Sequence, residues 1–524
     1  MKLKLLASAL LVTALQAFGQ QRMILFLADK SANENPELQF SARAEERRNL
    51  AGVEKDDYDL GLNPTHLAAL REKGRILNTS RWLNAVSYET NYTADEVRAQ
   101  FAFVERIRAI GPATASSIDK FANPTKSLDY GLAIDQVNQL NLQCLHEQGF
   151  TGTGMYLGII DAGFQGMDNN VYFDSVFLEN RVLDLYNFVD GTGLVYQYST
   201  HGTSVASCIV GEKPSPEQYA GTAVNVDLAL YLAEDVFSET EIEEFNVVAA
   251  LERADSVGVD VVNISLGYFE FDDTLTSHVY AELDGNTTIC AMGVNVAASK
   301  GIAVVMSAGN SGPSNISTPC DSDDGLCIGA VDVNGSYAFF SSVGPNADGQ
   351  VKPDVMARGW DTWVVVNPDT VVMGSGTSFS SPVMAGATAC LRQANPTKTV
   401  AQIFDAIRQI ASQFTTPDPF MGYGIPDVCI ADSILKVSGV GLQEVAENAV
   451  HVYPNPADEM VNISVPTSGL VNIRILDLCG EEVLIFEGKG AQQQVSVGHL
   501  STGIYLLEVS FDRQVKVQRL EIMP

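Results

Sequence analysis

The sequence predicts an α/β fold with a doubly wound, mostly parallel sheet, preceded by an α+β unit and followed by a β-sandwich. Three observations predict this. Residues 128–437 alternate apolar, strand-like runs with helical patterns, residues 20–127 mix a strand with charged helical segments, and residues 450–524 alternate with period two. A chain of 524 residues is also too long for one compact core.

Residues 1–19 have the pattern of a secretory signal peptide. Lys2 and Lys4 precede an apolar run, and the small residues around Gly19 suit cleavage after that position. No later stretch approaches 18 consecutive apolar residues, so we expect no transmembrane segment.

Residues 20–127 predict a small α+β unit. RMILFLADK predicts a strand, whereas the segments 66–77 (HLAALREKGRIL) and 93–110 (TADEVRAQFAFVERIRAI) predict amphipathic helices. Charge is dense between residues 40 and 60, and the unit ends in a polar stretch.

Residues 128–437 predict the parallel sheet. Near-continuous apolar runs indicate strands buried on both faces: MYLGIID, VDLALYLAE, VDVVNISLG, IAVVMSAGN and LCIGAVDV. Helical patterns lie between and after them: HGTSVASCIVG, EFNVVAALERADSVG, the segment around Ser378 and AQIFDAIRQIASQF. In such a fold, ligands bind at the carboxyl ends of the strands.

Residues 438–449 predict a linker, and residues 450–524 predict an antiparallel β-sandwich. Period-two alternation, punctuated by Gly and Pro, predicts strands in VNISVP, LVNIRILDL, QQVSVGHL, GIYLLEVSF and QVKVQRLEI.

Charge and cysteine content limit the class of protein. A formal net charge of −32 argues against nucleic-acid binding, which needs a basic surface.

Eight cysteines are present, and an exported protein can form disulfides. Cys320 and Cys327 flank a short turn and are the predicted pair, whereas Cys208 and Cys390 have small, apolar surroundings and are predicted to be buried thiols. The acidic turn DSDDG lacks the spacing of an EF-hand loop, so a solvated turn is favoured over a calcium site.

Four polar residues stand where apolar elements begin or end. Asp161 ends a predicted strand, Asn310 follows another, and His201 and Ser378 each open a predicted helix. Together they suit acyl transfer, because a serine nucleophile needs an imidazole base and the imidazole needs a carboxylate to fix its tautomer. The Ser378 backbone N–H and the Asn310 amide would then stabilise the oxyanion.

Each of these residues also has a simpler interpretation. A serine at a helix start is usually an N-cap, Asp161 could cap a turn, and Asn310 could hold its glycine-rich turn. The catalytic interpretation of Ser378 depends on the presence of the other three residues.

The order Asp161, His201, Ser378 is that of subtilisin, and the blocks IIDAGF, HGTSVAS, SAGNSG and GTSFSSP resemble those of the subtilisin-like serine peptidases. Ala162 departs from the Ser or Thr that many of these enzymes have there. The resemblance covers residues 128–437 and implies a serine endopeptidase that cleaves proteins or peptides through an acyl-enzyme. It implies that catalysis needs no cofactor or metal, and it allows a structural calcium ion without assigning ligands. NISLG resembles the strand that binds substrate and lines its pocket, which implies this role for Ser265, Leu266 and Gly267.

The two end segments resemble accessory domains. RRNLAGVEKDDYDL and SRWLNAVSYE resemble the propeptide of Bacteroidetes-type subtilases, which implies an inactive precursor. VYPNPADEMVNI, ILDLCGEEV and LSTGIYLLEV resemble sorting domains read by the type IX secretion machinery, although the end QRLEIMP is less basic than many. These resemblances imply export through the periplasm to the cell surface or the medium.

Two other classes of protein fit the sequence less well than a peptidase. An esterase of the α/β-hydrolase fold also uses Ser, His and Asp, but it needs G-x-S-x-G and places the serine first in the chain. A surface adhesin could retain an inert peptidase fold, but here every catalytic position is filled.

Overall fold

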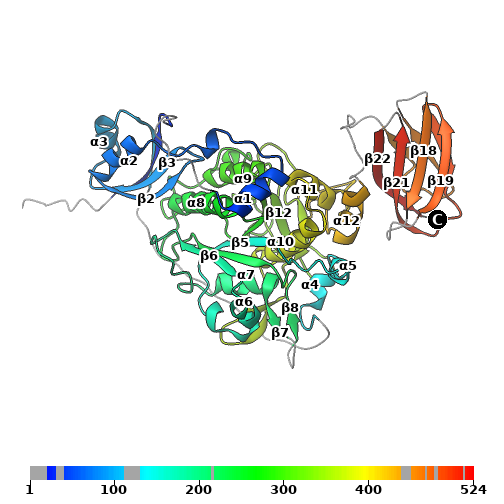
Figure 1. The fold of residues 1–524 in the computed structure, drawn as a ribbon, viewed down its shortest axis with the longest axis horizontal. Coiled ribbons are helices and arrows are strands. Elements are labelled where there is room, and N and C mark those ends of the chain that lie inside the picture. The colour runs from blue at the N-terminus through cyan, green and yellow to red at the C-terminus, as the bar shows by residue number, and fades with distance from the viewer. Residues whose placement is uncertain are drawn as a thin grey trace, which may run out of the picture.

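Figure 1 shows the fold in this computed structural model. The structure describes residues 21–30, 40–110, 130–213, 218–437, 450–465, 469–476, 482–511 and 514–523. The predicted signal peptide and linker lie outside the described residues. The predicted fold class is confirmed: an N-terminal α+β unit and C-terminal antiparallel strands flank a parallel sheet covered by helices.

The N-terminal unit contains an antiparallel sheet with the order β2-β3-β1-β4. Its strands are β1 (Gln21–Leu27), β2 (Arg75–Ser80), β3 (Ala85–Thr90) and β4 (Val104–Ala109). Its helices are α1 (Ala42–Leu50), α2 (Pro64–Arg71) and α3 (Ala94–Gln100), with the short turn η1 (Asp57–Asp59).

The two long helices predicted in this unit are wrong in their second halves. The segment 66–77 leaves helix α2 at Arg71 and enters strand β2, and the segment 93–110 leaves α3 at Gln100 and enters β4. β2 and β4 are the edge strands, so each has a paired neighbour on one side only and carries many exposed polar residues. Their mixture of apolar and charged residues therefore fitted a helical period as well as a strand period.

The central sheet has the strand order β13-β12-β11-β10-β5-β9-β6, and its recorded pairings are parallel. The strands are β5 (Tyr156–Asp161), β6 (Val182–Asn187), β9 (Asp227–Leu232), β10 (Val261–Ile264), β11 (Ala303–Ser307), β12 (Leu326–Val331) and β13 (Val355–Arg358). The sequence prediction located five of these strands but missed the outer strands β6 and β13.

Helices cover both faces of the sheet (Figure 1). α8 (Glu241–Val257) and α9 (Ile289–Ser299) pack on the face that includes Ile160 of β5. α7 (His201–Val210) and α10 (Thr377–Ala394) pack on the opposite face, which includes Ile159. Both faces of the strands are therefore buried, which explains their continuous apolar sequences.

Smaller elements complete this region. The remaining helices are α4 (Ile134–Asn138), α5 (Gln143–Glu147), α6 (Asp174–Leu178), α11 (Val400–Gln409) and α12 (Val428–Val437). Short 3-10 turns are η2 (Met167–Asn169), η3 (Val171–Phe173) and η4 (Tyr280–Glu282), and two hairpins pair β7 (Glu212–Lys213) with β8 (Tyr219–Ala220) and β14 (Thr362–Val366) with β15 (Thr370–Gly374).

The cysteines form two disulfides among the described residues. Cys320 is bonded to Cys327, as the sequence predicts. Cys144 is bonded to Cys429, a pair 285 residues apart that the sequence left undecided. Cys208, Cys290 and Cys390 are buried thiols.

The C-terminal unit contains two antiparallel sheets around one apolar core. One sheet has β16 (His451–Tyr453), β17 (Met460–Ser464) and β20 (Gln492–Ser496). The other has β18 (Leu470–Leu476), β19 (Glu482–Lys489), β21 (Gly503–Phe511) and β22 (Gln514–Ile522).

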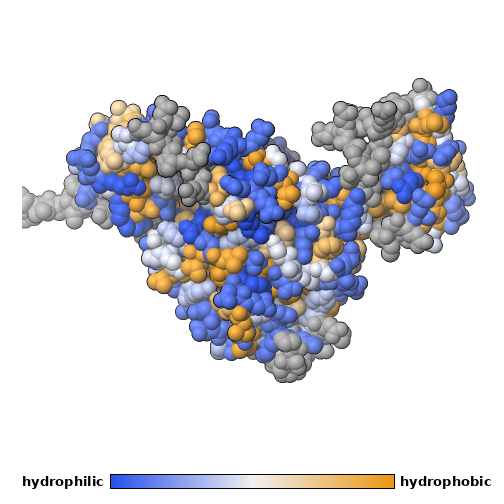
Figure 2. Space-filling view, in the orientation of Figure 1, coloured by the Kyte–Doolittle hydropathy of each residue, from blue (hydrophilic) through white to orange (hydrophobic). Residues whose placement is uncertain are grey.

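The molecular surface matches the acidic, polar composition. Figure 2 shows hydrophilic residues over much of one face, with smaller hydrophobic areas between them. Among the described residues, no helix is long and apolar enough to span a membrane.

Candidate active site

Asp161 is the last residue of β5, an interior strand between β10 and β9, and it is fully buried. Its Oδ1 lies 2.8 Å from His201 Nδ1 and accepts a hydrogen bond from the backbone N–H of Ala162 at 2.8 Å. Among the described residues, none donates a hydrogen bond to Oδ2. A buried carboxylate is costly without a partner, so its contact with the imidazole is a strong structural constraint.

His201 is the first residue of α7, and its side chain is 34% exposed. The start of this helix is pressed against the end of β5, because the Gly202 N–H donates to the Gly163 carbonyl at 3.0 Å. A Cβ at position 202 would lie 2.5 Å from that carbonyl oxygen. Glycine is therefore required for the close approach that brings His201 to Asp161.

Ser378 is the second residue of α10 and is only 8% exposed. The ring of Phe379, its neighbour in the chain, lies 6.1 Å from the His201 ring, measured between centroids. The hydroxyl of Ser378 donates to the Ser265 carbonyl at 3.4 Å. The first turn of a helix leaves backbone N–H groups without helical partners, so this serine stands where an anion would be stabilised.

A polar network fixes the first turn of α10 on strand β10. Ser265 Oγ donates to the Ser378 carbonyl at 2.9 Å, and Asn263 Nδ2 donates to Ser265 Oγ at 2.9 Å. Ser381 Oγ donates to Asn263 Oδ1 at 2.7 Å. All four residues are buried, so the network holds the Ser378 backbone in one position.

Asn310 follows β11, and Thr377 orients its side chain. The backbone N–H and the hydroxyl of Thr377 both contact Asn310 Oδ1, at 2.8 and 3.1 Å. Because the carbonyl oxygen of the amide is held in this way, its NH₂ group is left to act as a donor. Sequence reasoning missed the role of Thr377, whose only signal was its position directly before Ser378.

The residues predicted to bind substrate follow β10. Ser265 is buried in the network described above, and Leu266 is buried as well. A Cβ at Gly267 would lie 2.2 Å from Ser317 Oγ, so this position accommodates only glycine without rearrangement. Their substrate-binding role stays a prediction.

The acidic turn after Cys320 is held by protein donors. Asp321 is buried and accepts from the Gly285 N–H at 3.2 Å, while Asp323 accepts from Asn286 and Gln350 at 2.6 and 2.7 Å. Across the part of the chain that the structure describes, no group of three or more His, Cys, Asp or Glu residues is placed to hold a metal ion.

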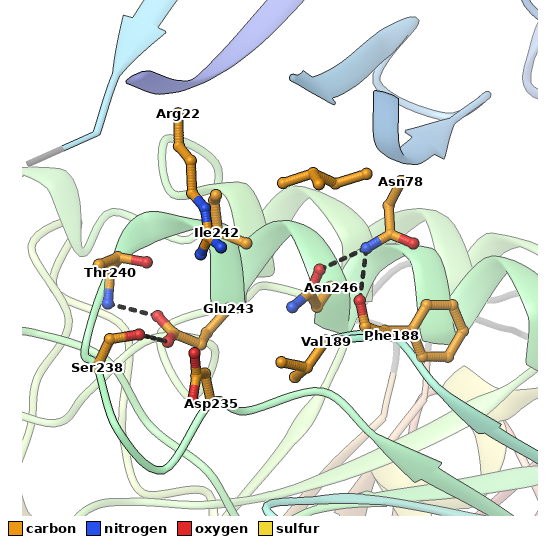
Figure 3. A pocket seen from close by; sticks show the side chains of 11 residues that line it. Arg22, Asn78, Phe188, Val189, Asp235, Ser238, Thr240, Ile242, Glu243 and Asn246 are labelled. Carbon is orange, nitrogen blue, oxygen red and sulfur yellow. Dashed lines mark hydrogen bonds between the residues drawn. The ribbon is translucent and has the colours of Figure 1, made fainter. Parts of the chain in front are cut away.

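A pocket lies between the N-terminal unit and α8 (Figure 3). Asn78 of β2 reaches across it and donates to the Phe188 carbonyl at 2.8 Å and to Asn246 Oδ1 at 2.7 Å. On the side of α8, Ser238 Oγ donates to Glu243 at 3.3 Å. The pocket is thus part of the contact between the two units rather than the site around Ser378.

Three segments of the chain match known families. Residues 152–424 match the subtilase family, residues 22–125 match the Peptidase S8 propeptide domain of Bacteroidota, and residues 451–523 match a secretion system C-terminal sorting domain.

Two subtilisins match the centre of the chain. Subtilisin DY from Bacillus licheniformis is 28% identical over 291 residues, which cover 55% of this chain and 92% of the relative. Subtilisin amylosacchariticus from Bacillus subtilis subsp. amylosacchariticus is 30% identical over 293 residues, 55% of this chain and 67% of the relative. A solved protease structure from Pseudoalteromonas arctica is 21% identical with a TM-score of 0.46, and the match covers 58% of this chain and 97% of the other.

Proposed function

This chain belongs to the subtilase family of serine endopeptidases, and from that premise we propose that Asp161, His201 and Ser378 are its catalytic triad. The observation that carries the proposal is the 2.8 Å contact between the buried Asp161 carboxylate and His201 Nδ1. The packing of the His201 ring near Phe379 supports it, because this contact puts the imidazole beside the first turn of α10.

The contact with Asp161 sets the tautomer of His201. Nδ1 carries the proton that is donated to the carboxylate, so Nε2 is left as the base that accepts the proton of Ser378. The carboxylate also stabilises the imidazolium that forms during attack. The serine oxygen then adds to the carbonyl carbon of the substrate peptide bond.

The negative oxygen of the tetrahedral intermediate is stabilised by the Ser378 backbone N–H and by the NH₂ group of Asn310. Collapse of the intermediate breaks the C–N bond, and the imidazolium of His201 gives its proton to the leaving amine. Water, deprotonated by the same imidazole, then hydrolyses the acyl-enzyme. These steps use protein groups alone, and catalysis in this family needs no cofactor. A structural calcium ion, with ligands unassigned, remains compatible with this mechanism.

The accessory domains indicate how the enzyme is exported and how its precursor is kept inactive. The chain has a subtilase propeptide domain, and its C-terminal sorting domain indicates export by type IX secretion to the cell surface or the medium. In the proposal, residues 1–19 direct passage into the periplasm and residues 20–127 block the precursor. Residues 128–437 form the mature enzyme that cleaves proteins or peptides, and residues 450–524 engage the secretion machinery.

Ser378→Ala in the full-length chain tests the triad, with Ser380→Ala as its matched control. Ser380 lies two residues away on the same helix, is buried, and donates to the Thr377 carbonyl. We expect Ser378→Ala to lose at least about 10⁴-fold in peptide hydrolysis and all labelling by a fluorophosphonate, while Ser380→Ala retains both. Unchanged hydrolysis or labelling in Ser378→Ala would refute the assignment. A wild-type enzyme that takes no label even after the N-terminal unit has been removed would point to an inert fold.

A further inference from the structure

Another pocket lies where α1 of the N-terminal unit meets the catalytic region. Gly154 and Met155, which precede β5, and Asp260, which precedes β10, line it from the amino end of the central sheet. Arg392 lines it from the last turn of α10, whereas Ser378 lies in the first turn of the same helix. The pocket is therefore at the opposite end of the sheet from the proposed triad.

Three arginines converge on this pocket. Arg43 of α1 donates to the Asp260 carboxylate. Arg392 Nη1 donates to the backbone carbonyls of Asp260 and Gly301, at 3.0 Å each. Arg47, also on α1, lies close to the same glycine, because a Cβ at Gly301 would be 3.5 Å from Arg47 Nη1. The backbone around Asp260 and Gly301 thus brings guanidinium groups of both units together.

The positive charges that line the pocket outnumber the negative ones. Its charged residues are Arg43, Glu46, Arg47, Asp260, Arg392 and Lys398. Arg43 is already paired with Asp260, and Arg47 is paired with the buried Asp255. Among the described residues, the guanidinium of Arg392 donates only to backbone carbonyls, and the ammonium of Lys398 forms no hydrogen bond or ion pair. Two cations therefore line the pocket without a carboxylate bound to them.

Burial makes this excess of positive charge unfavourable. Arg392 is half-buried, and its pKa is lowered, first by burial; Asp260 opposes this effect and the positive charge of Arg47 adds to it. Arg47 is 4% exposed, and no acceptor in the described part of the chain contacts its Nε. Removing a cation from water is costly unless negative charge and acceptors compensate. An anion between the two units would supply both.

We propose that this pocket binds a small divalent oxyanion of the phosphate or sulfate class, held between α1 and the end of α10. Arg392 and Lys398 supply donors from the catalytic region. Arg43 supplies Nη1, because its contacts with other described residues use only Nε and Nη2. Guanidinium groups present planar sets of N–H donors that match the oxygens of such an anion. The site itself does not depend on the proposed triad, whereas its effect on activity rests on the proposed block by residues 20–127.

An anion held by both units should strengthen their association. A ligand that binds only the assembled form stabilises it by a factor of one plus the ratio of its concentration to its dissociation constant. At about ten times its dissociation constant, phosphate should therefore lower the inhibition constant of the added N-terminal unit by about tenfold. Release of the N-terminal unit would thus be slowest where this anion is abundant.

Calorimetric titration of the full-length chain with sodium phosphate, at about pH 8 where phosphate carries close to two charges, tests the site directly. Ser378→Ala prevents self-cleavage, and mass spectrometry confirms that the chain is intact. We expect one saturable site with a dissociation constant of about 1 mM or below, as several charge-assisted hydrogen bonds allow. Sodium chloride at the same ionic strength should give no such signal. The readout needs no catalysis, so its outcome is independent of the triad.

Substitutions in the pocket should change phosphate binding in opposite directions. Arg43→Gln and Arg392→Gln should each weaken it by at least about tenfold, because each removes a charged donor from one of the two units. Lys398→Gln should weaken it about threefold, and it removes no hydrogen bond of the fold, so it stays informative if Arg392→Gln does not fold. Glu46→Gln should strengthen binding about threefold, because it removes an exposed negative charge from the pocket.

Arg253→Gln is the matched control, because it removes one positive charge from α8, where this arginine pairs with Asp184 and does not line the pocket. It should bind phosphate with unchanged affinity. The inference is overturned if phosphate gives no saturable signal below about 10 mM, or if chloride gives the same signal. It is also overturned if Arg43→Gln, Lys398→Gln and Glu46→Gln all bind phosphate with unchanged affinity.

Discussion

Replacing Asp255 by asparagine tests how the N-terminal unit is held on the catalytic region. Asp255 lies on α8 and is fully buried. Three arginines of the N-terminal unit donate to its carboxylate: Arg47 at 2.5 Å, Arg48 at 2.7 Å and Arg81 at 2.9 Å. Their side chains are 3%, 6% and 8% exposed, so the whole cluster is shielded from water.

A second layer of charges connects the same two units. Lys300, fully buried after α9, lies 2.5 Å from Asp56 and 3.5 Å from Asp59. Asp59 in turn pairs with Arg48 at 2.6 Å. Ion pairs of alternating sign thus connect residues 47–59 with the catalytic region. Asp255 accepts hydrogen bonds from three of the arginines.

The size of the effect follows from this burial. Asparagine keeps the shape and one acceptor oxygen of Asp255 but removes the negative charge facing three buried guanidinium groups. Loss of one partner of a buried ion pair costs about 3–5 kcal/mol, far more than the ~0–1 kcal/mol of an exposed pair. If that cost appears in association of the two units, their dissociation constant rises by roughly 10²- to 4 × 10³-fold.

The assay measures inhibition of the mature enzyme by the added N-terminal unit, residues 20–127, with a fluorogenic peptide as substrate. We expect Asp255→Asn to raise the inhibition constant by about 10²- to 4 × 10³-fold. Peptide hydrolysis should stay unchanged, because Asp255 lies near the end of α8 that leads to the amino end of β10, whereas Asp161 lies at the carboxyl end of β5. Glu179→Gln, which removes an exposed carboxyl that the N-terminal unit does not contact, should have no effect. An inhibition constant within threefold of the wild type would show that the cluster contributes little to binding.

Two further predictions concern other parts of the catalytic region. Asn310→Ala should lower kcat by about 10²- to 10³-fold with little change in KM, as is typical when one oxyanion donor is lost, and steady-state kinetics would measure this. At His278, burial opposes the charged form, but hydrogen bonds to Glu244 and Glu282 outweigh it and raise the pKa. The protonated histidine therefore stabilises the fold fully below pH ~6.5, and this contribution to the unfolding free energy is lost as pH rises through the raised pKa. In His278→Gln the unfolding free energy should decline less over the same pH range. Urea titration at several pH values would measure this.

The parts of the site that could be predicted from sequence are those fixed by strand ends and helix starts. Asp161 and Asn310 follow apolar strands, and parallel strands bring their carboxyl ends to one edge of a sheet. Their motifs therefore predicted one candidate site at that edge, and the structure brings Asp161 and His201 into contact there. The role of Thr377 could not be found in this way, because its contact with Asn310 joins residues 67 positions apart through a side chain that the pattern does not distinguish.

Long-range pairings were the other part that sequence could not supply. Cys144 and Cys429 are joined across 285 residues, and spacing carries no information about such a pair. The edge strands β2 and β4 were predicted as helices because a strand with one polar face and one paired edge has no continuous apolar run to identify it.

The acidic face of α8 shows why charge patterns are the hardest to interpret. In sequence, Asp255 falls within the helical pattern EFNVVAALERADSVG. That pattern does not identify its partners Arg47 and Arg48, which lie more than 200 residues earlier. The precursor and the mature enzyme therefore differ in how the charge of Asp255 is balanced. In the precursor, the arginines satisfy a carboxylate that would otherwise be costly to bury, whereas departure of the N-terminal unit returns Asp255 and the arginines to water. The same residues can therefore bind the propeptide tightly without leaving an unpaired buried charge in the mature enzyme.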